Sequence, residues 1–337
     1  MPRRLFLISA LLVVLGTAYA AYWHVMSERL AQGIERWAEE QRGHGLEAGW
    51  TDFVIDGFPL RLRARFAAPR LIQRDGELPW SWQGDSLTLE AQPWRLTRIR
   101  FAGDGTQTAR LAGQQIAFER LEGTTRIGAH GRIVETESRL SRLVLTPPAG
   151  GTGATADTLR LAFQRPEEAP RGHTTPGLTT EIAVGGLILA TRQKLPVEGP
   201  ADMTLRAAIM GAVPAPPGRQ ALTAWRDAGG TLEVERLTLD WSPLKLSASG
   251  TLALDHALQP IGALATQLAG HGPLLERLTA MGWVRPQDAR IAGIAFGLLE
   301  KPGADGKPVL KAPVTVQDGY LSIGPARLAP LPRIVWR

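Results

Sequence analysis

From Trp50 onward, most of the chain alternates apolar and polar residues with a period of two. Segments such as PLRLRARF, SLTLEAQ, TLRLAFQ, TLEVERLTLDW and LKLSASGTLALD put one kind of residue on each side of an extended backbone. A strand of this kind has one dry face and one wet face, which is typical of antiparallel sheets rather than of buried parallel ones. Turn dipeptides such as Asp104-Gly105 and Asp318-Gly319 separate the segments. The alternation therefore predicts curved antiparallel sheets.

Two helices are expected near the C-terminus. After Pro273 an apolar stripe at helical spacing predicts a first helix, and Pro286 begins a second one. In the second helix the spacing predicts that Ile291, Ile294 and Leu298 face inward. The expected fold class is thus a β-rich α+β fold, with curved antiparallel sheets and a few packed helices, preceded by a single N-terminal transmembrane helix.

The N-terminus carries an uncharged run of 19 residues, Leu5–Trp23, directly after Arg3 and Arg4. A run of about 20 apolar residues crosses the hydrocarbon core of a membrane as a helix. The preceding cations favour an N-in, C-out orientation, and the aromatic residues at the far end suit the headgroup region. We therefore expect a cytoplasmic stub at residues 1–4, an inner-membrane anchor at residues 5–23, and the bulk of the chain in the periplasm as a single-pass protein.

A cleaved signal peptide is the alternative, because Ala18-Tyr19-Ala20 is an acceptable cleavage site that would be cut after Ala20. Both interpretations export the remaining chain. Residues 24–45 are expected to form an amphipathic helix, because Leu30, Ile34 and Trp37 share one helical stripe. An exported β-rich domain at residues 46–337 follows. Two Gly/Pro/Thr-rich stretches, residues 146–158 and 165–177, look like exposed loops and suggest halves near 46–165 and 178–337.

The charge and cysteine content exclude several function classes. The net charge is +6, but the arginines are scattered singly rather than massed on one segment, so we expect no nucleic-acid partner. The chain has no cysteine, which excludes disulfides, thiolate nucleophiles and cysteine-ligated metals.

A Gly57-Phe58-Pro59 corner precedes the strand that contains Leu62. Gly57 gives the backbone freedom to turn, and Pro59, which lacks an N–H, suits the first residue or edge of a strand. Residues 60, 62, 64 and 66 are then expected to face one way and the arginines between them the other. The pattern of residues 56–64 recurs at residues 240–248, where Pro243 precedes the strand that contains Leu246. An internal duplication and a chance likeness both remain open.

Four segments carry a family resemblance: VIDGFPLRLRARF, AQPWRL, LDWSPLKLSASGTLALDHALQP and VQDGYLSIGPARLAPLP. They resemble an uncharacterised bacterial envelope family, the domain of unknown function 2125, over most of the chain after the anchor. The resemblance implies a single-anchor exported protein and supplies no catalytic residues. The strand-rich pattern of segments such as SGTLALD is also distantly similar to that of AsmA-like envelope proteins, whose long curved sheets are associated with lipid handling.

No catalytic motif is found in the sequence. There is no G-x-S-x-G elbow and no phosphate-binding glycine loop, and the six histidines are spaced singly. We therefore predict no enzyme activity, no catalytic residue, no metal site and no cofactor. Trp80 and Trp82 share one face of an extended segment and are the best-marked ligand candidates, although they would equally serve as core.

These observations favour a non-enzymatic envelope protein whose sheet binds lipid or another amphiphile. The candidate ligand surface comprises Leu62, Trp80, Trp82 and Leu246, because an apolar sheet face that few helices cover is open to a ligand. A scaffold or interaction module in envelope assembly is the alternative, with the sheet closed on itself and its protein partners unknown. A glycan hydrolase is the third reading, and it would need two carboxyl groups beside the tryptophans.

Overall fold

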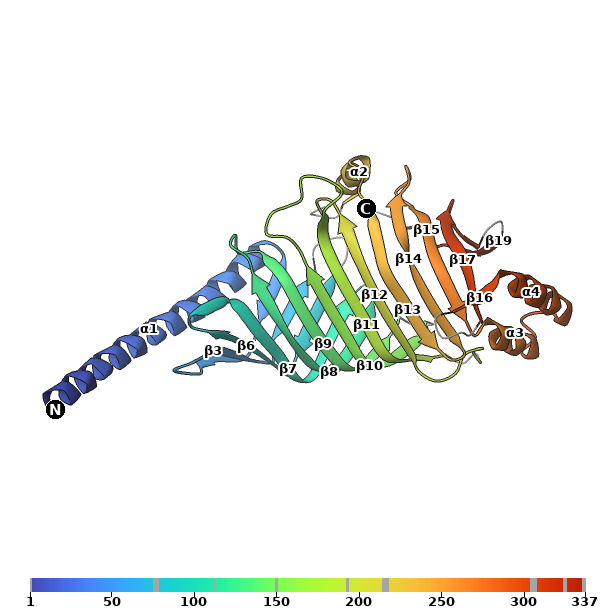
Figure 1. Ribbon diagram of the computed structural model, residues 1–337. Helices are drawn as coiled ribbons and strands as arrows, with labels where there is room; N and C mark the ends of the chain where they lie inside the picture. The colour runs from blue at the N-terminus through green and yellow to red at the C-terminus, as the bar shows by residue number, and fades with distance from the viewer. Residues whose placement is uncertain are drawn as a thin grey trace. The chain divides into compact units, whose positions relative to one another are not determined.

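The computed structural model of the chain (Figure 1) describes residues 2–74, 79–111, 113–148, 151–191, 194–213, 218–303, 308–323 and 326–334. The helices are α1 (Pro2–Gly43), α2 (Arg219–Asp227), α3 (His271–Ala280) and α4 (Pro286–Leu299). Every strand pairing in this described part of the chain is antiparallel, which confirms the predicted fold class.

The N-terminal helix α1 runs without a break from Pro2 to Gly43. It therefore contains both the apolar run and the amphipathic segment of the sequence. Among the residues that the structure describes, α1 is the one helix that is long and apolar enough to cross a membrane. A signal sequence has the same two properties. Its apolar half is exposed, whereas Ala38 near its C-terminal end is buried and the helix there packs on strand β1 (Leu46–Gly49).

The chain divides into two compact units, each described here by itself. The first unit contains Met1–Ile127 with Thr146–Ala149, and the second contains Gly128–Leu145 with Gly150–Arg337. The first unit holds α1 and strands β1 (Leu46–Gly49), β2 (Asp52–Asp56), β3 (Leu62–Ala67), β4 (Arg70–Gln73), β5 (Trp80–Gly84), β6 (Ser86–Gln92), β7 (Arg95–Leu111) and β8 (Gln114–Ile127). The division near residues 165–178 that the sequence suggests stays a prediction.

Strand β7 organises the sheet of the first unit. Its first half pairs with β6, which continues to β3 and β2. Its second half pairs with β5, which continues to β4 and β1, and β8 pairs along its other edge. The core of this unit is an aromatic cluster in which Phe66 lies 5.3 Å from Trp50 and 5.7 Å from Phe53, measured between ring centroids.

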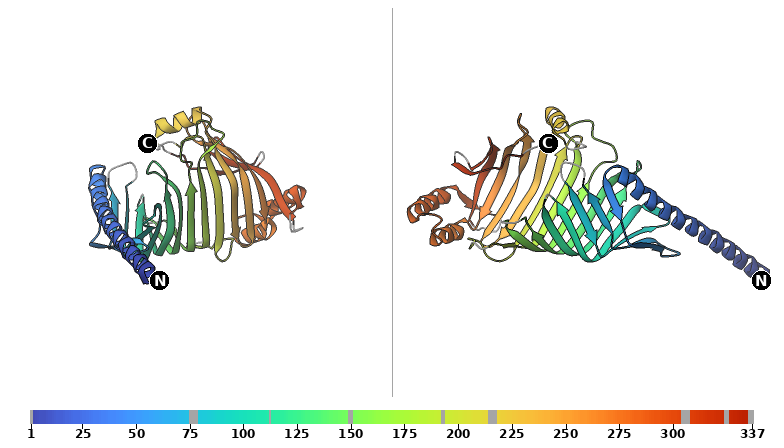
Figure 2. Two further views of the ribbon diagram at one scale, coloured as in Figure 1. Left: turned by 60° about the vertical axis from the view of Figure 1, so that its left-hand side comes forward. Right: turned by 180° about the vertical axis from the view of Figure 1, so that it is seen from behind.

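The second unit is a sheet that follows chain order. Its strands are β9 (Ile133–Thr146), β10 (Gly153–Gln164), β11 (Pro176–Ala190), β12 (Ala201–Met210), β13 (Leu232–Trp241), β14 (Leu244–Leu254), β15 (Pro260–Ala269), β16 (Glu300–Pro302), β17 (Pro308–Gln317), β18 (Tyr320–Ile323) and β19 (Ala326–Pro330). Strands β9 to β15 pair in sequence, and β17 adds to β15. Both views in Figure 2 show these strands side by side in one layer. The predicted loop at 146–158 is wrong in its second half, where β10 has begun.

Small side chains make up much of what the second unit buries. Its buried apolar residues are Val134, Leu143, Ala154, Ala201, Ala207, Ala208, Val234, Ala248, Leu258, Leu310, Ala312 and Val316. Half of these are alanines, which remove little apolar area from water. The larger aliphatic side chains of this unit therefore remain mostly half-buried.

The helices α3 and α4 form at the predicted places, but the inward face of α4 differs from the prediction. Ile291 and Ile294 are 61% and 70% exposed. The ring of Phe296 takes the inner side instead, 5.3 Å from the imidazole of His271. An α-helix turns 100° per residue, so Ile294 lies about 200° around the axis from Phe296. Leu298 lies outside the residues whose side chains are described.

The two proline corners both form hairpin connections. The first joins β2 to β3, with Asp56 opposite Arg63, and the second joins β13 to β14, with Asp240 opposite Lys245. In both, the acidic residue pairs with a base beyond the proline: Asp56 with Arg63 and Arg65, and Asp240 with Lys245 at 2.7 Å. The peptide bonds before both prolines are cis. The first connection is longer, so Pro59 lies in the turn and not in a strand.

Candidate ligand-binding surface

One face of the second unit's sheet carries an unbroken apolar row across eight strands. In register from β9 to β17 it contains Leu140, Leu159, Val184, Met203, Leu239, Leu246, Leu268 and Leu310. Residues directly opposite each other on neighbouring strands place their side chains on the same face, about 5 Å apart. The eight side chains therefore form a continuous aliphatic stripe at right angles to the strands.

A second row lies two residues further along each strand. It contains Ser138, Leu161, Ile182, Leu205, Leu237, Ala248, Thr266 and Ala312. We call these two rows together the apolar face. It is almost free of polar side chains, and Thr266, one of its two hydroxyl groups, donates a 2.6 Å hydrogen bond to the carbonyl oxygen of Ala312.

Most of the large side chains on the apolar face are neither buried nor fully exposed. Leu310 is buried at 4% exposure, whereas the other seven members of the first row are half-buried. The main helix–strand packing in the described part of this unit is that of α4 on β17, so the row is covered at one end. Half-burial across seven strands leaves aliphatic surface that a further apolar group can cover.

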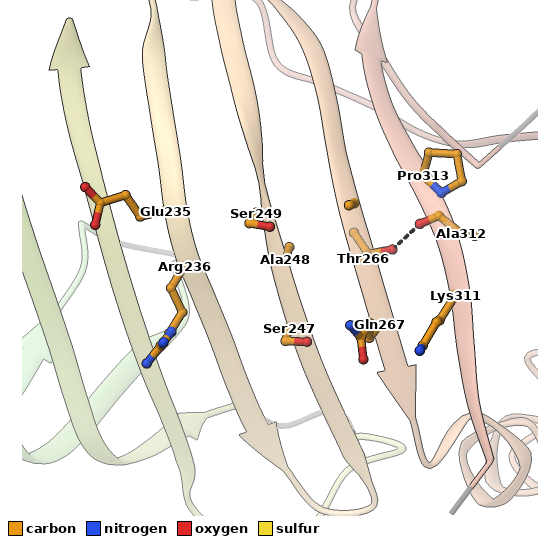
Figure 3. A pocket seen from close by; sticks show the side chains of 11 residues that line it. Glu235, Arg236, Ser247, Ala248, Ser249, Thr266, Gln267, Lys311, Ala312 and Pro313 are labelled. Carbon is orange, nitrogen blue, oxygen red and sulfur yellow. Dashed lines mark hydrogen bonds between the residues drawn. The ribbon is translucent and has the colours of Figure 1, made fainter. Parts of the chain in front are cut away.

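The opposite face of the same strands is polar. A shallow depression of about 450 Å³ on β13–β17 is lined by residues of this face together with Ala248, Thr266 and Ala312 of the second row. Figure 3 shows its lining: Glu235 and Arg236 from β13, Ser247 and Ser249 from β14, Gln267 from β15, and Lys311 from β17. Glu235 is held by Arg206 at 2.8 Å. The depression can donate hydrogen bonds to a polar molecule through the side chains of Arg236, Gln267 and Lys311.

The predicted ligand residues occupy different environments. Leu246 lies in the first row of the apolar face, half-buried, where it can contact a ligand. Leu62 is 2% exposed and belongs to the core of the first unit, so a charge at this position would test folding rather than ligand contact. Pro243 lies in the connection that leads into β14.

Trp80 and Trp82 lie on one face of β5 and are both half-buried. Their in-register neighbours on β4 and β7 are Gln73, Leu71, Leu111 and Ala109. None of these four neighbours carries a carboxyl group. The tryptophans are therefore surrounded on the sheet by apolar and amide side chains.

The corner residues Phe58 and Pro59 contact the N-terminal helix. Tyr19 donates a hydrogen bond through its hydroxyl group to the carbonyl oxygen of Pro59, and the ring centroid of Trp23 lies 5.5 Å from that of Phe58. Gly57 has a φ of +103°, and a Cβ atom there would lie 2.8 Å from the carbonyl oxygen of Arg61. A glycine is therefore required for the turn to close.

Sequence reasoning missed most of the apolar face. It selected Leu246 but not its row partners, because period-two alternation marks which residues share a face within a strand and not which residues lie opposite each other. No group of three or more His, Asp or Glu side chains that could hold a metal ion occurs in the residues that the structure describes.

Comparison with known proteins shows the family to which the chain belongs. Residues 23–332 match the family model described as "Uncharacterized protein conserved in bacteria (DUF2125)". The chain belongs to the DUF2125 family. No curated protein and no solved structure matches it. The DUF2125 match begins at Trp23, at the end of the apolar run, and extends through both units. The residues of the apolar face in this chain all lie within the region that the DUF2125 family model covers.

Proposed function

We propose that this protein is a non-enzymatic, membrane-anchored envelope protein whose apolar face binds lipid or another amphiphile. The observation that carries the proposal is the in-register row from Leu140 to Leu310, in which seven of eight aliphatic side chains are half-buried. Because these aliphatic side chains are only half-buried, they leave an apolar surface that acyl chains can cover.

The proposal includes an inner-membrane anchor with the body of the chain in the periplasm. Helix α1 supports it by its length and composition, and Arg3 and Arg4 at its start favour an N-in orientation. The helix is also continuous through Ala20, and Tyr19 and Trp23 on either side of this position bond to the first unit. Retention of the anchor keeps these contacts, whereas cleavage after Ala20 would remove that of Tyr19.

The surface charges support a ligand other than nucleic acid. Several arginines are neutralised by carboxylates on neighbouring strands, as in Arg63 with Glu90 at 3.2 Å and Arg206 with Glu235 at 2.8 Å. Cations that are paired in this way offer less to a phosphate backbone than a free basic patch does.

Photocrosslinking in cells tests the proposal with a matched pair of positions. A photoreactive phenylalanine analogue replaces Leu246 on the apolar face or Lys245, its neighbour on the opposite face of β14. After irradiation, mass spectrometry of the purified full chain identifies adducts. The proposal predicts a lipid adduct at position 246 and none at position 245.

The other outcomes separate the alternatives. A protein adduct at position 246 would favour the scaffold, in which another chain covers the apolar face. A folded protein with no adduct at position 246 would mean that the face is closed, and the lipid proposal would be abandoned.

A further inference from the structure

The first unit holds two of its hairpin turns against the end of the apolar run of α1. The indole Nε1 of Trp23 donates a 2.9 Å hydrogen bond to the carbonyl oxygen of Arg61, in the β2–β3 turn. The hydroxyl group of Tyr22 donates a 3.1 Å bond to the carbonyl oxygen of Pro93, in the β6–β7 turn. Together with the bond from Tyr19 to the first turn, these contacts tie both turns to residues 19–23 of the helix.

The contact zone coincides with the level at which the helix leaves the apolar region. The uncharged run ends at Trp23, and His24 and Glu28 follow. Tyrosine and tryptophan with one polar group and a large apolar ring are the residues that settle at the headgroup level of a bilayer. The two turns are therefore held at this same level.

Both turns present large apolar side chains to their surroundings. Phe58 and Leu60 in the β2–β3 turn are 54% and 61% exposed, and Trp94 in the β6–β7 turn is 61% exposed. Leu96, at the start of β7, is exposed as well. We call these four side chains the loop tips. A group of exposed apolar side chains of this kind is typical of a surface that contacts a membrane or another protein.

Cationic side chains accompany the loop tips. Arg95 and Arg98 are exposed at the start of β7. Arg61 lies beside Leu60, and its side chain is 53% exposed while it pairs with Glu90 at 3.2 Å. Apolar side chains bordered by arginines match the two layers of a bilayer surface, an acyl region and anionic headgroups.

We propose that the loop tips insert into the interfacial layer of the membrane that α1 enters, so that the first unit is seated on the bilayer and not merely tethered to it. The inference rests on the anchor of the proposed function, but it is independent of ligand binding by the apolar face. Three helix-to-turn hydrogen bonds fix the angle between helix and hairpins, and insertion of Phe58, Leu60 and Trp94 adds contacts with lipid beyond those of the helix.

Site-directed spin labelling of the full chain in nanodiscs of phosphatidylethanolamine and phosphatidylglycerol tests the proposal. The chain has no cysteine, so each label needs a single substitution. Labels at Leu60→Cys, Trp94→Cys and Leu96→Cys report on the loop tips. We expect accessibility to oxygen, relative to a water-soluble nickel chelate, to be several-fold higher at these positions than at a label in water.

Two control positions make the outcome specific. Leu111→Cys labels an exposed leucine at the other end of β7, about 45–50 Å along the strand from Leu96, and is expected to be aqueous. Val13→Cys labels the middle of the anchor and is expected to show the profile of hydrocarbon. A hydrocarbon profile at position 13 with aqueous profiles at 60, 94 and 96 would overturn the seating and leave the anchor intact.

The remaining outcomes are also decisive. Low accessibility to both reagents at the loop tips would mean that protein covers them, and this result overturns the bilayer contact. An aqueous profile at position 13 would refute the anchor itself, and the seating with it. Because the two turns are separate, failure of one variant to fold leaves the other turn to decide the result.

Discussion

The indole of Trp23 and the carbonyl oxygen of Arg61 are joined by a 2.9 Å hydrogen bond, although 38 residues separate them. This bond connects the last residue of the apolar run to the turn that precedes the first long alternating strand. It gives the Gly57-Phe58-Pro59 corner a structural role, because the corner packs against α1. Trp23 also packs its ring edge-on against Phe58.

Replacement of Trp23 by phenylalanine is expected to loosen this junction. The ring contact with Phe58 is kept in large part, whereas the Arg61 carbonyl oxygen loses its donor. One hydrogen bond contributes about 0.5–1.5 kcal/mol. We expect faster proteolysis within residues 57–61 and a lower melting temperature of the first unit in nanodiscs. Trp37→Phe, at an exposed tryptophan of the same helix, serves as the control, and an equal effect of the two changes would contradict the role of the bond.

Gly270→Ala is expected to destabilise the second unit strongly. Gly270 precedes α3 with a φ of +79°, and a Cβ atom there would overlap the carbonyl oxygen of Pro243. Left-handed backbone at a non-glycine residue costs about 1–2 kcal/mol, and the overlap adds to it. The free energy of unfolding in urea measures the loss.

Gly282→Ala is the matched control for this change. Gly282 has a φ of +73°, and a Cβ atom there meets nothing within 4 Å. It isolates the backbone term, of about 1–2 kcal/mol. If both variants lost the same stability, the contact between Gly270 and Pro243 would have no energetic weight.

Leu246→Asp is expected to remove lipid from the apolar face without unfolding the protein. Its side chain is half-buried among Leu239 and Leu268, and a carboxylate there repels acyl chains. A photocrosslinker at Leu239 should lose its lipid adduct, with the far-UV circular dichroism spectrum unchanged. Ser249→Asp, on the polar face of the same strand, should leave the adduct intact. Persistence of the adduct in folded Leu246→Asp would count against the apolar face.

Glu300→Ala is expected to destabilise the packing of α3. The Oε1 atom of Glu300 lies 2.7 Å from Nε2 of His271, whose side chain is buried. Removal of the carboxylate leaves a buried ring nitrogen without a partner, which costs about 1–3 kcal/mol. Glu300→Gln keeps an oxygen acceptor and should lose clearly less. Thermal unfolding compares the two variants, and equal losses would show that hydrogen bonding at His271 is not what the carboxylate provides.

Several features follow from the sequence because they depend on neighbours in the chain. The alternation at residues 244–252 predicted which side chains of β14 share a face, and the structure has them so. The apolar run at residues 5–23 predicted a helix, since its length and composition suffice. Pro286 began α4 at the predicted residue, since proline suits the first turn of a helix.

Tertiary structure decided what depends on partners far along the chain. The face that α4 turns inward was set by the contact of Phe296 with His271, which overrode the stripe of Ile291 and Ile294. The contact of the proline corner with Trp23 likewise joins segments that no local pattern relates.

An apolar N-terminal helix followed by antiparallel strands with one dry face each could be predicted from the sequence, because periodicity and composition are local properties of the chain. The folded chain was needed to show that Leu140, Leu239, Leu246 and Leu310 belong to one row, and that two turns meet the helix at Tyr19, Tyr22 and Trp23. Strand register and long-range docking are fixed by the summed packing of many pairs, and a shift of one residue would move each side chain to the other face.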